Sequence, residues 1–212
     1  MSVIAPTITA FDLHEYRAQM DRITPFAKRI HIDLMDGIFA PTKSPDIDKL
    51  WLPEEIVCDV HVMYQHPFHQ LKKLLAMNPA MLIIQAEADR QSVEDFIKHV
   101  KKTRVRLGIS LLSETSPQEV HVKKLIKQAD YVLIFSGHLG YHGGSADLAL
   151  LEKVGQIHEI NPLAEIGWDG GINMNNVHAL VGGGIDVLNV GSGIQKALHP
   201  KTAYIELMDV CN

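Results

Sequence analysis

The chain has 212 residues, of which 46% are hydrophobic and 21% charged, and its formal net charge is −5. Length and composition are those of a folded protein of one or at most two domains, which excludes disordered, collagen-like and coiled-coil chains. A mildly acidic chain without a basic run of five or more residues is also a poor candidate for binding nucleic acid or an anionic membrane.

Short runs rich in valine and isoleucine alternate along the chain with longer amphipathic stretches. Eight runs predict strands, at residues 2–7, 29–33, 57–62, 81–85, 106–110, 131–135, 164–169 and 187–190. Apolar residues at three- and four-residue spacing predict helices over residues 67–77, 92–103, 120–128 and 147–160. Ser92 and Asp95 resemble a capping box at the start of the second of these helices.

Strands that alternate with helices predict an α/β fold with a parallel sheet. Eight such units fit a single-domain (β/α)8 TIM barrel over residues 1–212. A doubly wound open sheet is the alternative. Residues 38–55, between the second and third strands, contain three prolines and predict a long loop at the mouth of a site.

Polar side chains interrupt the apolar runs near the carboxyl ends of several predicted strands. Strand alternation places together on one face His31, Asp33 and Met35 of the second strand, Asp59, His61 and Met63 of the third, and Gln85 and Glu87 of the fourth, while the seventh ends in Asp169. In a barrel this face looks into the lumen, and active sites lie at the carboxyl ends of the strands. We therefore expect the two histidines His31 and His61 to meet Asp33 and Asp169 there.

Buried charges of this kind persist only when they are paired or bound to a metal. Two imidazoles and two carboxylates are a ligand set suited to Zn²⁺, Fe²⁺, Mn²⁺ or Co²⁺. A simple hydrogen-bonded His–Asp pair is the alternative on any single strand. The recurrence of the pattern at three strand ends favours a metal site with acid–base chemistry.

Glycines gather after three consecutive predicted strands. They are Gly140, Gly143 and Gly144 after the sixth, Gly170 and Gly171 after the seventh, and Gly191 and Gly193, flanking Ser192, after the eighth. Loops after strands seven and eight of a barrel often bind phosphate through backbone N–H groups. The sequence thus predicts a phosphate site, with ordinary turn glycines as the alternative.

Neither a secretion signal nor a membrane span is indicated by the sequence. The start MSVIAPTITAFD has no positive stretch ahead of an apolar one, and no apolar run approaches 18 residues. Cys58 and Cys211 lack CxxC spacing, which favours a reducing compartment. We expect a cytoplasmic protein.

Five segments taken together resemble one enzyme family. APT at 5–7, HIDLMDG at 31–37, DVHVM at 59–63, DGG at 169–171 and VGS at 190–192 are similar to ribulose-phosphate 3-epimerases and their relatives acting on other ketose phosphates. The resemblance runs over nearly the whole chain, in order and at matching spacing. It implies a metal-dependent barrel that inverts C3 of a pentulose or hexulose phosphate, and a homo-oligomer, dimer or larger.

The resemblance also implies roles for individual residues. One divalent ion (Zn, Fe, Mn or Co) would be held by His31, Asp33, His61 and Asp169. Asp33 and Asp169 would be catalytic and act on opposite faces of the substrate. The sugar phosphate would contact Thr7, Met35, Met63, Gly140, Gly143, Gly144, Gly170, Gly171, Gly191 and Ser192. Asp59 is expected to orient a ligand histidine.

The chain departs from the family pattern on the substrate side. Thr7 stands where a serine is usual, Gln85 where strand four commonly has a histidine, and Phe135 where a methionine is expected. The loop after the sixth strand reads HLGYHGGS instead of a close variant of NPGFGGQ. We expect His138 and His142 of this loop to contact the substrate, whose identity the sequence leaves open.

Two other functions are compatible with a sugar-phosphate barrel. Related decarboxylases and aldolase-like synthases usually carry a lysine in a DxKxxD run on strand three, and no such run occurs here. A non-catalytic phosphosugar-binding protein would have no need of a carboxylate pair. The altered loop after the sixth strand is its only support.

Overall fold

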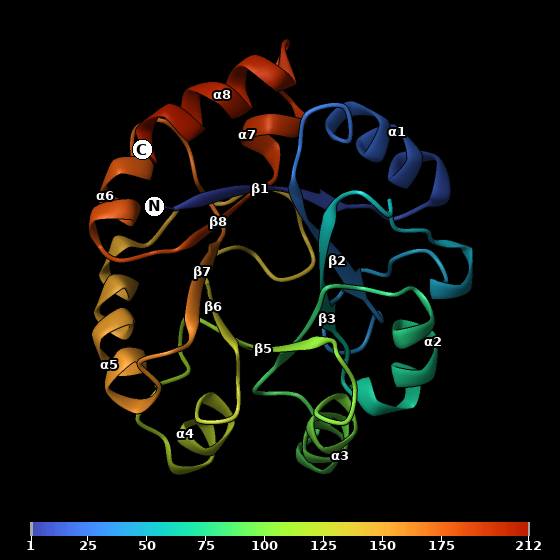
Figure 1. The fold of residues 1–212 in the computed structure, drawn as a ribbon, viewed down its shortest axis with the longest axis vertical. Helices are drawn as coiled ribbons and strands as arrows, with labels where there is room; N and C mark the ends of the chain where they lie inside the picture. Colours follow the sequence, from blue (N-terminus) through green and yellow to red (C-terminus); the bar gives the residue numbers. More distant parts are fainter. Residues whose placement is uncertain (1, 212) are drawn as a thin grey trace.

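The computed structural model describes residues 2–211. Within them, parallel strands pair in chain order and close into one barrel (Figure 1). The strands are β1 (Val3–Thr9), β2 (Arg29–Met35), β3 (Val57–Met63), β4 (Met81–Gln85), β5 (Arg106–Leu111), β6 (Tyr131–Phe135), β7 (Glu165–Asp169) and β8 (Val187–Val190). The predicted (β/α)8 barrel is confirmed, and the open-sheet alternative is wrong because β8 pairs with β1, with Val187 opposite Val3.

The helices form a ring around the strands (Figure 1). They are α1 (Leu13–Ile23), α2 (Leu71–Ala76), α3 (Arg90–Val100), α4 (Val120–Ile126), α5 (Glu152–Ile160), α6 (Val177–Gly182), α7 (Ser192–Gln195) and α8 (Pro200–Val210), with 3₁₀ turns η1 (Ile47–Lys49), η2 (Pro67–Gln70) and η3 (Leu148–Leu151). Among residues 2–211, no helix has the length and apolar character needed to cross a bilayer.

The start of α3 differs from the prediction. Asp89 precedes the helix, and its carboxylate accepts a hydrogen bond from the Ser92 backbone N–H at 2.9 Å. The predicted capping box of Ser92 and Asp95 is therefore wrong, because Asp89 already satisfies the free N–H of the first turn. The helix consequently begins at Arg90, two residues earlier than predicted.

Strand alternation divides the core into two parts. Outward side chains such as Ile32 and Val60 belong to the large cluster beneath the helices. Inward side chains fill the lumen with Ala5, Met81, Ile83, Tyr131, Leu133 and Val187. Gly167 is needed here, because a Cβ at this position would lie 1.7 Å from the Tyr131 hydroxyl. The lumen is thus packed solid below the level at which the polar residues appear.

A charged cluster occupies the amino-terminal end of the lumen. Arg29 Nε donates to Asp59 at 2.6 Å, and the two Nη atoms of Arg29 donate to Glu165 at 2.8 and 3.0 Å. The prediction that Asp59 orients a ligand histidine is therefore wrong. Asp59 lies opposite His31 in register, but its carboxylate accepts a hydrogen bond from Arg29 and not from the histidine. The arginine neutralises the buried carboxylate.

Candidate active site

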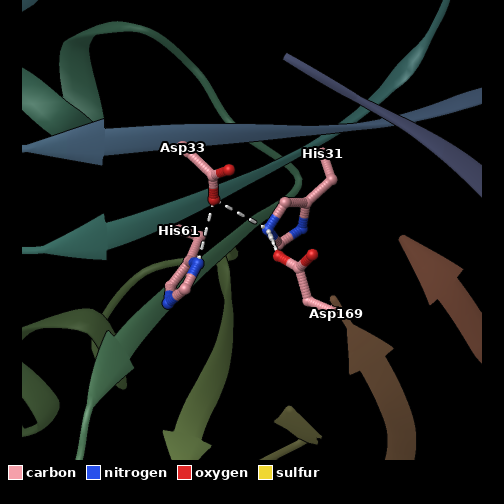
Figure 2. Close-up of side chains that lie close together, drawn as sticks. All are labelled: His31, Asp33, His61 and Asp169. Carbon is pink, nitrogen blue, oxygen red and sulfur yellow. Dashed lines mark hydrogen bonds and ion pairs between the residues drawn. The ribbon is translucent and has the colours of Figure 1, made fainter. Parts of the chain in front are cut away.

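Four polar side chains converge at the carboxyl end of the barrel (Figure 2). They form the His–Asp cluster, which comprises His31, Asp33, His61 and Asp169, and one potential ligand atom of each lies within 4.8 Å of the others. The register of the strands explains the convergence. Asp33 lies directly opposite His61 on the neighbouring strand, and it follows His31 by two residues, so that both point to the same face. β7 brings Asp169 in at its last residue.

The contacts in the His–Asp cluster centre on one carboxylate oxygen. Asp33 Oδ1 lies 3.0 Å from His61 Nδ1 and 3.3 Å from His31 Nε2. His31 Nε2 lies 3.5 Å from Asp169 Oδ2. Both imidazoles are fully buried, whereas the side chains of Asp33 and Asp169 keep 8% and 12% of their surface exposed. The carboxylates are thus the members of the cluster that a small molecule can reach.

The cluster fits a divalent cation. His31 Nε2 and Asp169 Oδ2 are buried, and neither has a hydrogen-bond partner within residues 2–211. Polar atoms left in this state are costly in a folded protein. Both atoms face the space that Asp33 and His61 also border (Figure 2), so an ion there would satisfy them.

The environment drives the pKa values of the two carboxyl groups apart. Burial alone would raise the pKa of Asp33, but contacts with His31 and His61 hold it well below its usual range. Burial, followed by the charge of Asp33, raises the pKa of Asp169 to about 7. At neutral pH this pair offers one ionised carboxylate and one group able to carry a proton, as acid–base catalysis requires.

A small cavity that is partly open to solvent lies above the His–Asp cluster. Most of the predicted substrate contacts line it: Thr7, Met63, Gly140, Gly143, Gly170, Gly171, Gly191 and Ser192, together with Asp33 and Asp169. Met35 and Gly144 are not among the lining residues. Met35 is fully buried and packs behind Met63, and Gly144 lies against His138.

Two of the predicted phosphate-binding glycines also have a packing reason. A Cβ on Gly170 would lie 2.2 Å from the Gly137 nitrogen, and one on Gly171 would lie 2.1 Å from the Ala146 nitrogen. Any side chain at these positions would push the loop after β6 away from β7. Glycine at these two positions is therefore explained by packing, and only the place of both residues in the cavity wall connects them with a ligand.

The loop after β6 covers the cavity and contacts two other loops. His138 and His142, which we expect from the sequence to contact the substrate, both line the cavity. His142 Nε2 lies 3.4 Å from Glu15, and its ring meets Phe11 edge-on at 5.1 Å. The Thr42 hydroxyl, in the long loop after β2, donates to the Gly140 carbonyl. The loop after β2 thus contacts the loop that covers the cavity, although none of its described residues is among those that line the cavity.

Three residues make contacts in the site that the sequence did not predict. β1 extends to Thr9, whose hydroxyl donates to Asp33 Oδ2 at 2.7 Å. Asn189 of β8 lines the cavity. Gln85 Nε2 lies 2.8 Å from His61 Nε2. The alternation of polar residues in VIAPTIT and VLNV is the signal that would have pointed to Thr9 and Asn189.

Comparison with known proteins identifies the family of this chain. The model of the ribulose-phosphate 3 epimerase family matches residues 3–195. This chain belongs to that family. Ribulose-phosphate 3-epimerases of Helicobacter pylori strain J99 and Encephalitozoon cuniculi are similar to it. The first is 27% identical and covers 98% of this chain and 97% of its own. The second is 30% identical and covers 77% and 73%.

Membership of the ribulose-phosphate 3-epimerase family makes the chain an enzyme of the isomerase class. Among solved structures, 3-hexulose-6-phosphate synthase of Salmonella typhimurium superposes with a TM-score of 0.74 at 15% identity over 99% of this chain and 98% of that one. KGPDC from Streptococcus mutans gives 0.75 at 10% identity over 100% and 97%. At these identities the likeness concerns the fold alone.

Proposed function

We propose that this protein is a metal-dependent 3-epimerase of a ketose phosphate. The substrates would be ribulose 5-phosphate and xylulose 5-phosphate, or a related pentulose or hexulose phosphate such as allulose 6-phosphate. One observation carries the proposal: two carboxyl groups with opposite pKa shifts, Asp33 and Asp169, face one cavity beside two buried imidazoles. Membership of the ribulose-phosphate 3-epimerase family supports it.

Inversion at C3 needs a base on one face of the carbon and an acid on the other. Asp33, ionised at neutral pH, takes the C3 proton, and the electron pair of the broken C–H bond moves into an enediolate. Asp169, whose pKa of about 7 keeps a proton available, returns one to C3 from the opposite face. The two groups exchange roles when the other epimer is the substrate.

The neighbours of the carboxylates support these roles. The hydroxyl of Thr9 holds Asp33 Oδ2 at 2.7 Å and so sets the direction in which Asp33 presents its oxygen. Met63 and Phe135 line the cavity beside it and exclude water from the reacting carbon. A divalent ion held by the His–Asp cluster would supply Lewis-acid stabilisation of negative charge on the substrate oxygens. Zinc, iron, manganese and cobalt all suit this ligand set.

The phosphate would lie on the opposite side of the cavity. Gly143 has no neighbouring atom within 4 Å of a Cβ position, so its backbone faces open space. Gly191 and Ser192 line the same cavity from the end of β8. Backbone N–H groups of such glycine-rich loops bind phosphate oxygens.

The test is metal-dependent exchange of the C3 proton with solvent. The protein is incubated in D₂O with Zn²⁺, Mn²⁺, Fe²⁺ or Co²⁺ and each ketose phosphate, and deuterium at C3 is followed by NMR. We expect incorporation and inversion that disappear when a chelator removes the metal. If a sugar phosphate binds but its C3 proton does not exchange in the presence of any of the four ions, the protein is instead a non-catalytic binding protein.

A lyase or synthase that depends on a lysine is less consistent with the site. No lysine is among the described residues that line the cavity. In the same samples, such an enzyme would break a carbon–carbon bond of the substrate. The NMR spectra would then show the fragments instead of an epimer.

The loop after β6 forms a lid over the cavity, and removal of either of its imidazoles, His138 or His142, is expected to weaken substrate binding. In His138→Ala and His142→Ala, loss of a single hydrogen bond or ring contact should raise KM roughly 3- to 10-fold and leave kcat within about twofold. Steady-state kinetics with the active ketose phosphate measure both constants. His158→Ala, an exposed histidine of α5, is the matched control. An unchanged KM in both lid variants would contradict the predicted contacts.

A further inference from the structure

Gln85 of β4 contacts the His–Asp cluster, and this contact has no role in the proposed reaction. Gln85 Nε2 lies 2.8 Å from His61 Nε2, on the side of the ring opposite Asp33. Both side chains have no exposed surface. The imidazole is therefore held between a carboxylate at one nitrogen and a primary amide at the other.

Two nitrogen atoms at this distance form a hydrogen bond only if one of them offers a lone pair. The amide nitrogen of Gln85 can only donate, so His61 Nε2 must accept and the ring proton must lie on Nδ1. That proton then faces Asp33 Oδ1 at 3.0 Å. In this tautomer both ring nitrogens are satisfied, but Nδ1 has no lone pair for a cation.

A cation bound at Nδ1 requires the opposite tautomer, with the ring proton on Nε2. The amide of Gln85 accommodates it by a half-turn about its last side-chain bond, which replaces the donor by the acceptor Oε1. This oxygen is buried and has no hydrogen-bond partner within the described chain. The amide thus has its second position available without displacing another bond.

We infer that Gln85 is a positioning residue for His61, whose amide exchanges donor for acceptor so that Nδ1 can bind a divalent ion while Nε2 stays hydrogen-bonded. The inference rests on the proposed metal-dependent function. Partners of this kind, which bond the outer nitrogen of a ligand histidine, set its tautomer and the direction of its ring. Glutamine is suited to the task because it serves both tautomers.

Two substitutions separate the hydrogen bond from mere packing. Gln85→Met keeps the length of the side chain but has no donor and only a weak acceptor for Nε2, whereas Gln85→Glu keeps a strong acceptor. Ser110→Ala is the matched control, because Ser110 lies opposite Gln85 in register, is buried, and has no hydrogen-bond partner among residues 2–211. Circular dichroism and thermal melting first establish that each variant is folded.

The primary measurement is the dissociation constant of Zn²⁺ by competition with a chelator. We expect Gln85→Met to bind Zn²⁺ about 10- to 100-fold more weakly, and Gln85→Glu and Ser110→Ala to stay within about threefold of the parent or bind more tightly. Long-range ¹H–¹⁵N NMR of the histidine rings gives a second readout. It should show the His61 proton on Nδ1 alone in the metal-free parent, where the Gln85 amide nitrogen faces Nε2.

Unchanged Zn²⁺ affinity in Gln85→Met overturns the inference, as does an equal loss in Gln85→Glu or Ser110→Ala, which would indicate packing alone. A ring proton already on Nε2 in the metal-free parent also overturns it. These failures differ from failure of the proposed function. If the parent itself binds no divalent ion, both proposals fall, whereas a metal-binding, epimerising parent with an indifferent Gln85→Met removes only this one.

Discussion

Replacing Asp169 with asparagine is expected to lower kcat for epimerisation by about 10³-fold, within the 10²- to 10⁴-fold range of a lost general acid or base. Asparagine has nearly the same shape but cannot carry the proton that a group with a pKa of about 7 provides. Asp33→Asn should cause a loss at least as large, because its carboxylate also contacts both imidazoles of the His–Asp cluster. Steady-state rates of inversion measure the effect.

Proton exchange without inversion distinguishes the two aspartates. With one carboxylate gone, the other can still remove the C3 proton that faces it and return deuterium to the same face. We therefore expect Asp169→Asn to exchange C3 in one epimer and Asp33→Asn, if it retains metal, in the other. Two controls are needed: metal analysis of each variant, and Asp95→Asn, which changes a half-buried aspartate of α3 that accepts a hydrogen bond from Gln91. Full inversion by either variant would contradict the two-carboxylate mechanism.

The second large effect concerns stability. Arg29→Met is expected to lower the free energy of unfolding by about 3–5 kcal/mol, the usual result of removing one partner of a buried ion pair. Asp59, whose side chain is 1% exposed, would lose its only counter-ion among the described residues. Urea denaturation at pH 7 measures the loss.

Two further variants test the physical reason. Asp59→Asn in the Arg29→Met background removes the uncompensated charge, so a large part of the lost stability should return. Arg106→Met is the matched control, because its ion pair with Glu165 is 43% exposed on the arginine side, and such pairs contribute about 1 kcal/mol or less. Equal losses in the two arginine variants would show that burial of Asp59 is not the cause.

The pH dependence of this difference has a definite sign. Arg29 and Arg106 lower the pKa of Glu165 below its ordinary 4.5, against the effect of burial. Burial raises the pKa of Asp59 despite its bond to Arg29, so Glu165 is the carboxylate whose ionisation favours the folded state. Its contribution is full above the unfolded pKa and is lost as pH falls through the lower folded value. The deficit of Arg29→Met should accordingly shrink in acid below about pH 4.5.

The strand order and the cluster-forming residues could be predicted because both depend on local patterns. A period of two in HIDLM and DVHVM determines which side chains share a face. Closure of a barrel then leaves one lumen for all such faces, and Asp169 joins them as the last residue of a buried strand. No knowledge of packing was needed to expect His31, Asp33, His61 and Asp169 together.

Partners across the lumen were decided by tertiary structure. Asp59 lies opposite His31 in register, but its hydrogen bond is with the Arg29 guanidinium. Met63 reaches the cavity whereas Met35, its register partner on β2, is covered by the loop after that strand. The same holds for the contact of Gln85 with His61 and for the hydroxyl of Thr9 on Asp33.

The division has a physical reason. Which face a side chain occupies follows from the two-residue repeat of its own strand, whereas its partner depends on the stagger of strands distant in sequence. That stagger is set by closure of β8 on β1 and by the volume of the side chains that fill the lumen. The sequence alone therefore determined the fold and the chemical groups of the site, and only the packed barrel decided which atoms bond and how the lid contacts its neighbours.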